Sequence, residues 1–103
     1  MSYADRDGVI WMDGQKVKWK EANVHILTHS LHYGVGVFEG IRAYETDNGT
    51  SIFRLDSHIK RLYQSAHILE MEIPFSFETI REACVESVKN NNLTSAYIRP
   101  IVY

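Results

Sequence analysis

The stretch from Leu31 to Tyr44 constrains the fold most, because it places aromatic residues and an arginine around three glycines. We interpret the part after Val37 as a β-strand, in which successive side chains point to opposite faces of a sheet. Four residues then share one face: Phe38, Gly40, Arg42 and Tyr44. A cation among aromatic groups is costly to bury unless an anion or several acceptors pair with it. This face therefore predicts a site for a carboxylate or a phosphate.

The glycines of this stretch do not form a dinucleotide-binding motif. Their pattern, Gly34-x-Gly36-x-x-x-Gly40, is one residue off the G-x-G-x-x-G fingerprint, and no clear strand precedes it. A Rossmann-type site is therefore not expected. Gly34 and Gly36 instead give the backbone freedom for a bend, and Gly40 leaves room for a ligand or a side chain.

The composition argues against nucleic acid and membranes as partners. The net charge is −2, from 11 Lys and Arg residues against 13 Asp and Glu residues, which gives no general attraction to nucleic acid or an anionic membrane. No segment resembles a signal peptide or approaches the length of a membrane span. We expect a cytoplasmic protein. The one cysteine, Cys84, agrees with a reducing compartment and is predicted to be a buried helix residue.

The first third of the chain predicts strands. Asp13-Gly14 favours a tight β-hairpin between residues 9–12 and 15–19. Residues 23–27 suggest a third strand, and residues 28–33 predict a loop or short helix that leads into the glycine stretch.

Turn formers and a proline organise the later strands. Residues 40–45 and 51–54 flank a hairpin loop at residues 46–50. Residues 95–103 predict a last strand, in which Pro100 belongs at an edge or a bulge.

Two helices lie between these strands. Asp56 and Ser57 can cap the first helix, whose apolar residues recur at helical spacing: Ile59, Leu62, Ala66 and Leu69. Ser76 begins the second helix, which ends at residues 90–92 and has the apolar seam Phe77, Ile80, Cys84 and Val88.

The order of elements and the chain length predict one small domain over residues 1–103. Its fold class is α+β, a two-layer sandwich of an antiparallel or mixed sheet with helices on one face. The chain stops on Ile101-Val102-Tyr103 without a polar turn, so we expect a fragment of a longer polypeptide.

Other candidate residues gain weight only in combination. Tyr97 and Arg99 are two residues apart in the last strand, so their side chains lie on one face and repeat the aromatic and cationic pattern of Phe38 and Arg42. A guanidinium in such a place can bind a carboxylate with two hydrogen bonds. Arg61, in an otherwise apolar helix, is alone typical of a surface cation. No metal site is expected from His25, His29 and His32, which lie in strand and loop. No residue is an evident nucleophile or catalytic base.

Five segments in order make the pattern specific: His32-Tyr33-Gly34, Val37 to Arg42, Phe53-Arg54, Arg61-Leu62 and Tyr97 to Pro100. Together they resemble the branched-chain amino acid aminotransferases, which are fold-type IV enzymes that use pyridoxal phosphate. The resemblance runs from about Ile10 to the last residue. It implies the N-terminal domain of that fold.

The resemblance also implies a role for individual residues. Arg61 matches the arginine that binds the cofactor phosphate. Tyr33 and Phe38 match aromatic walls of the substrate pocket, Tyr33 being lent by the neighbouring subunit of a dimer. Gly40 matches a small residue beside the substrate. The remaining three match groups around the substrate: Tyr97 near the α-carboxylate, Arg99 at the distal carboxylate of glutamate, and Arg42 near the pocket without an assigned role.

The implied reaction transfers the amino group of leucine, isoleucine or valine to 2-oxoglutarate, which becomes glutamate, in a homodimer or higher homo-oligomer. The lysine that binds the cofactor covalently, and the acidic partner of its pyridine nitrogen, belong to a C-terminal domain that these residues do not contain. We therefore expect no catalytic residue in this chain and no activity from it alone.

Three rival interpretations remain. The first two are other fold-type IV enzymes, a D-amino acid aminotransferase and an aminodeoxychorismate lyase. The Phe38 to Arg42 and Tyr97 to Pro100 segments favour the branched-chain group over both. The third is a non-catalytic α+β domain for dimerisation or ligand sensing.

Overall fold

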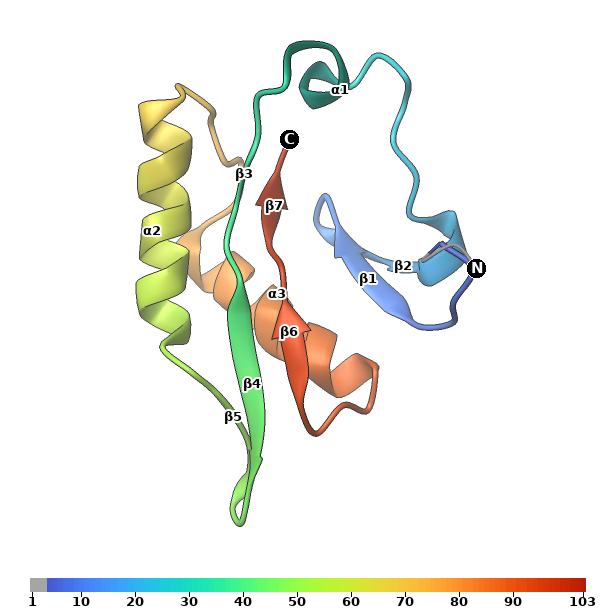
Figure 1. The fold of residues 1–103 in the computed structure, drawn as a ribbon, viewed down its shortest axis with the longest axis vertical. Coiled ribbons are helices and arrows are strands. Elements are labelled where there is room, and N and C mark those ends of the chain that lie inside the picture. Colours follow the sequence, from blue (N-terminus) through green and yellow to red (C-terminus); the bar gives the residue numbers. More distant parts are fainter. Residues whose placement is uncertain (1–3) are drawn as a thin grey trace.

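The computed structural model, which describes residues 4–103, confirms the α+β fold class (Figure 1). Its strands form three antiparallel sheets instead of one. The N-terminal hairpin pairs β1 (Val9–Met12) with β2 (Gln15–Lys18), and a two-stranded sheet pairs β3 (Val37–Phe38) with β7 (Ile101–Val102). The third sheet has the order β5-β4-β6, with the bounds Gly49–Ile52, Ile41–Thr46 and Ala96–Ile98.

The predicted N-terminal hairpin is confirmed. Asp13 and Gly14 both have positive φ angles, 49° and 89°, as a type I′ turn requires. Trp11 lies opposite Lys16 across the hairpin and packs edge-on against Phe75, with ring centroids 5.1 Å apart. This contact joins the hairpin to the segment that precedes the second long helix. A short 3-10 helix, Trp19–Glu21, follows β2.

The predicted third strand over residues 23–27 is wrong. The backbone there turns, because His25 makes local hydrogen bonds: its Nδ1 accepts from Leu27 N at 3.0 Å, and its carbonyl accepts from Thr28 N at 2.9 Å. Such side-chain bonds compete with strand pairing. The short helix expected next is present as α1 (His29–Tyr33), which ends at Gly34 in the left-handed conformation.

The two later strand predictions need adjustment at their ends. Thr46 pairs with Gly49, so the turn is shorter than the predicted loop of residues 46–50, and β5 begins two residues early. The last strand divides into β6 and β7 around Arg99 and Pro100. The bond from Glu39 N to the Pro100 carbonyl, 3.1 Å, bridges this break.

The long helices are α2 (Leu55–Ile68) and α3 (Phe77–Asn90). Ser76 caps α3 as predicted, accepting from Thr79 N at 3.1 Å. At α2 the predicted cap is wrong: the N-cap is Arg54, in the left-handed conformation with a φ of 52°. Asp56 lies inside the first turn and pairs with Arg81 of α3 at 2.8 Å.

Helices α2 and α3 pack against one side of β3 and β6 (Figure 1). The core lies between the strands and the helices and includes Ile41, Ile59 and Leu62, each at most 2% exposed. In Figure 1, α2 runs beside β3 and β4 while α3 passes behind β6. Among the described residues no helix is long and apolar enough to cross a membrane.

Candidate functional site

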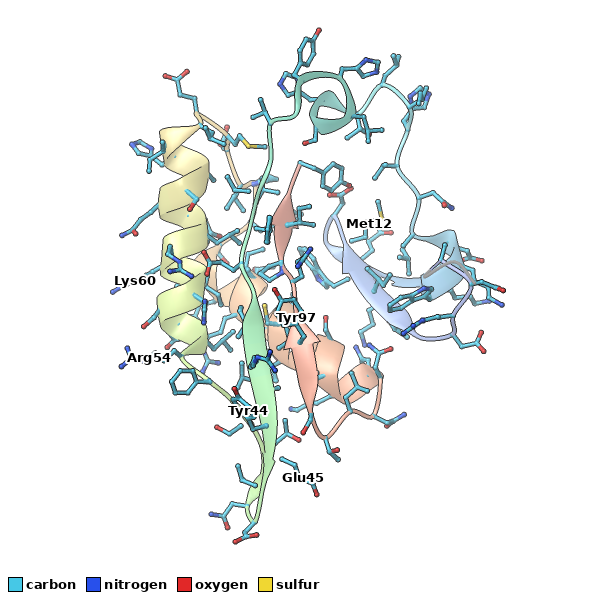
Figure 2. The ribbon with its side chains drawn as sticks, in the orientation of Figure 1. Met12, Tyr44, Glu45, Arg54, Lys60 and Tyr97 are labelled. Carbon is cyan, nitrogen blue, oxygen red and sulfur yellow. The ribbon has the colours of Figure 1, made fainter. Side chains whose placement is uncertain are left out.

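The predicted alternation along β3 and β4 is present in the structure. Val37, Glu39, Ile41 and Ala43 are buried toward the helices, whereas Phe38, Arg42 and Tyr44 are exposed on the opposite side. We call this opposite side the outer face, formed by Phe38, Gly40, Arg42, Tyr44, Tyr97 and Arg99. Tyr44 and Tyr97 mark its position on β4 and β6 in Figure 2. The backbone register sets Arg42 directly opposite Tyr97.

Arg99 is surrounded by aromatic groups on the outer face. Its guanidinium carbon lies 4.6 Å from the ring centroid of Phe38 and 5.4 Å from that of Tyr97. Its Nη2 also donates to the Tyr97 hydroxyl at 3.3 Å. A cation over the faces of two rings gains electrostatic attraction. The cluster therefore combines an apolar surface, a hydroxyl and a positive charge within one patch.

Gly40 makes room for this cluster. A Cβ at that position would lie 2.8 Å from Cζ of Tyr97 and closer still to its hydroxyl oxygen. Only a residue without a side chain lets the tyrosine ring lie over the junction of β3 and β4. The free space expected at Gly40 is thus filled by Tyr97.

Tyr33 and Arg42 lie apart from the Arg99 cluster. Tyr33 is 72% exposed, and its ring contacts within residues 4–103 are with His29 and His32 of its own helix. Arg42 is exposed, and its guanidinium has no ion-pair partner in the described part of the chain.

Arg61 lies on the helix side and pairs with a buried carboxylate. Its Nε donates to both oxygens of Glu39, at 3.1 and 2.9 Å, and its Nη2 donates to Oε1 at 2.8 Å. The Glu39 side chain is 4% exposed, whereas that of Arg61 is 65% exposed. The guanidinium thus has one edge on the protein and the other toward solvent.

His58 completes this group, which we call the Glu39 triad: Glu39, His58 and Arg61. Nδ1 of His58 lies 2.7 Å from Oε1 of Glu39. The hydrogen bonds from Arg61 hold the pKa of the Glu39 carboxyl below its ordinary value of 4.5, against burial, and His58 adds to the effect. The same pairing raises the pKa of Arg61. The carboxylate is therefore ionised at neutral pH.

Glu39 is the residue that sequence reasoning missed. An acidic residue at an inward position, between Val37 and Ile41, has to find a cation. The polar stripe of the first helix offered His58 and Arg61, three residues apart and so on one face. The chain thus holds two groups on opposite sides of the β3–β4 junction: the aromatic cluster around Arg99, and the Glu39 triad.

The comparisons with known proteins agree on one family. A family model described as amino-transferase class IV matches residues 36–103. The branched-chain-amino-acid aminotransferase of Pseudomonas aeruginosa is 61% identical over 103 residues, which is 100% of this chain and 34% of that protein. The Escherichia coli K12 enzyme of the same name is 46% identical over 94 residues, 91% of this chain and 30% of that protein.

Solved structures with the same name are also similar to this chain. A branched-chain amino acid aminotransferase from T.th., complexed with N-(5'-phosphopyridoxyl)-L-glutamate, superposes with a TM-score of 0.92 at 53% identity, covering 95% of this chain and 33% of that one. The Escherichia coli structure gives a TM-score of 0.91 at 44% identity over the same shares. The chain spans about a third of the length of these relatives. Because the family model covers more than half of the sequence, the chain belongs to the amino-transferase class IV family.

Proposed function

We propose that this chain is the N-terminal domain of an aminotransferase that transfers the amino group of leucine, isoleucine or valine to 2-oxoglutarate. The observation that carries the proposal is the outer-face cluster, in which the Arg99 cation lies on the rings of Phe38 and Tyr97. The names and identities of the relatives support the same activity.

The cluster suits two different substrates. A pocket for both leucine and glutamate has to accept an aliphatic side chain and a carboxylate in one place. Phe38 supplies an apolar wall, and Arg99 supplies the cation for the distal carboxylate of glutamate or 2-oxoglutarate. The Tyr97 hydroxyl serves the substrate α-carboxylate. Arg42, exposed on the same face, adds positive charge near the pocket.

The Glu39 triad suits the phosphate of pyridoxal phosphate. Within residues 4–103 the hydrogen bonds of the Arg61 side chain use Nε and Nη2, so Nη1 is available to an anion. A guanidinium is the preferred partner of phosphate oxygens. When bound, the cofactor stores the amino group between the two halves of the reaction and withdraws electrons from the substrate. This chain contributes a phosphate contact, and the lysine and the acidic partner of the cofactor belong to a C-terminal domain beyond residue 103.

The proposed assembly is a homodimer or a higher homo-oligomer in the cytoplasm. Tyr33 and its neighbour Leu31 are 72% and 59% exposed, and apolar side chains at this density suit a subunit contact that lends Tyr33 to the partner's pocket. Cys84 is buried, and burial raises the pKa of its thiol to about 11, as suits a structural thiol in a reducing compartment.

The direct test measures glutamate formed from leucine and 2-oxoglutarate by the full-length protein supplied with pyridoxal phosphate. We expect turnover with leucine, isoleucine and valine and none from residues 1–103 alone. Turnover of D-alanine instead, or conversion of aminodeoxychorismate, would replace the proposal by one of the related enzymes. A full-length protein that binds no pyridoxal phosphate would favour a non-catalytic domain.

A further inference from the structure

We propose that Glu39 is a positioning residue for Arg61. By holding one edge of the guanidinium, Glu39 determines which edge meets the cofactor phosphate. The inference rests on the proposed function, in which Arg61 contacts that phosphate. It adds a role for a buried carboxylate that itself touches neither substrate nor cofactor.

The geometry of the pair leaves the guanidinium little freedom. Three hydrogen bonds of 2.8 to 3.1 Å join Nε and Nη2 of Arg61 to the two oxygens of Glu39. Two bonded nitrogens fix the plane of a guanidinium as well as its position. Without them, an arginine side chain that is 65% exposed would sample many rotamers, and an anion would have to order it on binding.

The carboxylate is itself held in place. Oε1 of Glu39 lies 2.7 Å from Nδ1 of His58, and its side chain is 4% exposed between the inward residues of β3 and β4. His58 and Arg61 are three residues apart on α2, so one helix face supplies both donors. The orientation of Arg61 is therefore set by the packing of a strand junction against a helix.

The arrangement predicts which edge of Arg61 a phosphate meets. Glu39 takes Nε and Nη2, so a phosphate approaches the edge that carries Nη1. The negative charge of Glu39 by itself repels a phosphate, and its benefit comes only through the oriented guanidinium. Repulsion by Glu39 raises the Kd of a phosphate ligand, whereas orientation of Arg61 lowers it, so removal of the charge tells which effect is larger.

The test uses the full-length protein without cofactor and measures the Kd of pyridoxal 5'-phosphate by visible absorption. We expect Glu39→Gln, which keeps the shape and removes the charge, to raise this Kd by roughly tenfold, the size of effect seen when a metal-binding residue loses its hydrogen-bond partner. The Kd of pyridoxal, which lacks the phosphate, should stay unchanged. Glu72→Gln, the same change at an exposed position of the 71–76 segment, is the matched control and should alter neither value.

A double variant separates positioning from a general effect on the fold. In an Arg61→Ala background, Glu39→Gln should no longer weaken the binding of pyridoxal 5'-phosphate, because there is no guanidinium left to orient and only the repelling charge is removed. An equal loss in both backgrounds, an equal loss for pyridoxal, or tighter binding by Glu39→Gln in the protein that keeps Arg61 would each overturn the inference.

The same series distinguishes this inference from the proposed function. If Arg61→Ala weakens pyridoxal 5'-phosphate while Glu39→Gln does not, the phosphate contact stands and the positioning role is wrong. If Arg61→Ala leaves the Kd unchanged, the phosphate assignment fails and the inference fails with it.

A second variant serves if Glu39→Gln does not fold. Glu39→Asp keeps the charge but moves it away from Arg61 by one methylene. The measurement is then the shift in melting temperature that inorganic phosphate causes. A smaller shift than in the unsubstituted protein supports positioning, and an equal shift contradicts it.

Discussion

Gly40 and Tyr97 illustrate how single residues shape the outer face. The absent side chain of Gly40 is what allows the Tyr97 ring to lie over the β3–β4 junction, where its hydroxyl meets Arg99. Arg99 in turn covers Phe38. Each of these side chains is placed by its neighbour, so a change of a few atoms at one position moves the others.

We therefore expect Gly40→Ala to displace Tyr97 and to lower kcat/KM for leucine, in the proposed reaction of the full-length protein, by roughly 10- to 100-fold. The free energy of unfolding should fall by about 1 kcal/mol or less, because the ring is half exposed and can swing away. Steady-state kinetics and urea unfolding measure the two effects. In a Tyr97→Ala background the added methyl group has nothing to displace, so a further loss there would contradict this account.

Arg99→Gln tests the dual-substrate pocket. In the proposed function Arg99 binds the distal carboxylate of glutamate. We therefore expect loss of its charge to lower kcat/KM for glutamate by roughly 10- to 100-fold, with a much smaller change for leucine. Single-turnover kinetics with each amino acid give the two values. Lys16→Gln on the distant hairpin removes the same charge and serves as the control. Equal losses for glutamate and leucine would mean that Arg99 acts on the fold and not on the carboxylate.

At the scale of elements, helix α2 both packs against the core and positions two polar side chains. Its buried stripe, which includes Ile59 and Leu62, packs against the strands, and the adjacent stripe carries His58 and Arg61 to Glu39. Because both stripes belong to one rigid helix, the depth of the core packing also sets the position of Arg61. Lys60, in contrast, points away from the molecule (Figure 2).

Leu62→Ala should destabilise the full-length protein by about 2–5 kcal/mol, since Leu62 is 2% exposed and its removal leaves a cavity. Lys60→Ala, two residues away on the same helix, should change the free energy of unfolding by less than about 0.5 kcal/mol. Urea unfolding followed by far-UV circular dichroism compares the two variants. A similar small effect of both would show that α2 is not anchored through this position.

Local chemistry explains which elements could be predicted from sequence. Asp13-Gly14 and the Ser76 cap each act within a few residues, and both were predicted correctly. The apolar alternation around His25 was misleading because that residue bonds its own neighbours. The Arg54 cap was missed because its left-handed conformation is uncommon for a residue other than glycine, and its side chain makes no capping hydrogen bond.

The candidate site follows the same division. The period of two along a strand was enough to predict that Phe38 and Arg42 share a face, and that Tyr97 and Arg99 do. The contact between Arg99 and Phe38 depends on how the strands pair, and only the structure shows it. Pairing between Glu39 and Arg61 depends on how α2 docks against the β3–β4 junction, which periodicity does not specify. Sequence therefore indicated the cation, and the structure supplied the carboxylate that holds it.

At the scale of the whole molecule, the two faces of the strands differ in what covers them. The inner face lies under α2 and α3 and contains the core, whereas the outer face and α1 expose large side chains such as Phe38, Tyr97 and Leu31. Glu39, on the inner face at the β3–β4 junction, couples the strands to α2 through its hydrogen bonds with Arg61.

That coupling gives the stability of the molecule a defined pH dependence. The pKa of Glu39 lies below its ordinary value of 4.5 in the folded state, chiefly because Arg61 donates to it. The folded state therefore binds this proton more weakly than the unfolded state does. The resulting stabilisation is fully present above pH 4.5, and it is lost as the pH falls through the lower pKa of Glu39 in the folded state. Glu39→Gln has no such proton to bind.

We therefore expect the difference in free energy of unfolding between the unsubstituted full-length protein and Glu39→Gln to be constant from about pH 6 to about pH 5. The difference should then shrink steadily toward about pH 3, because acid removes from the unsubstituted protein the same charge that the substitution removes. Urea unfolding at half-unit steps of pH measures it, and Glu72→Gln provides the exposed comparison. A difference that grows on acidification would mean that the folded state holds the Glu39 proton more tightly than the unfolded state, which the contacts with Arg61 and His58 oppose.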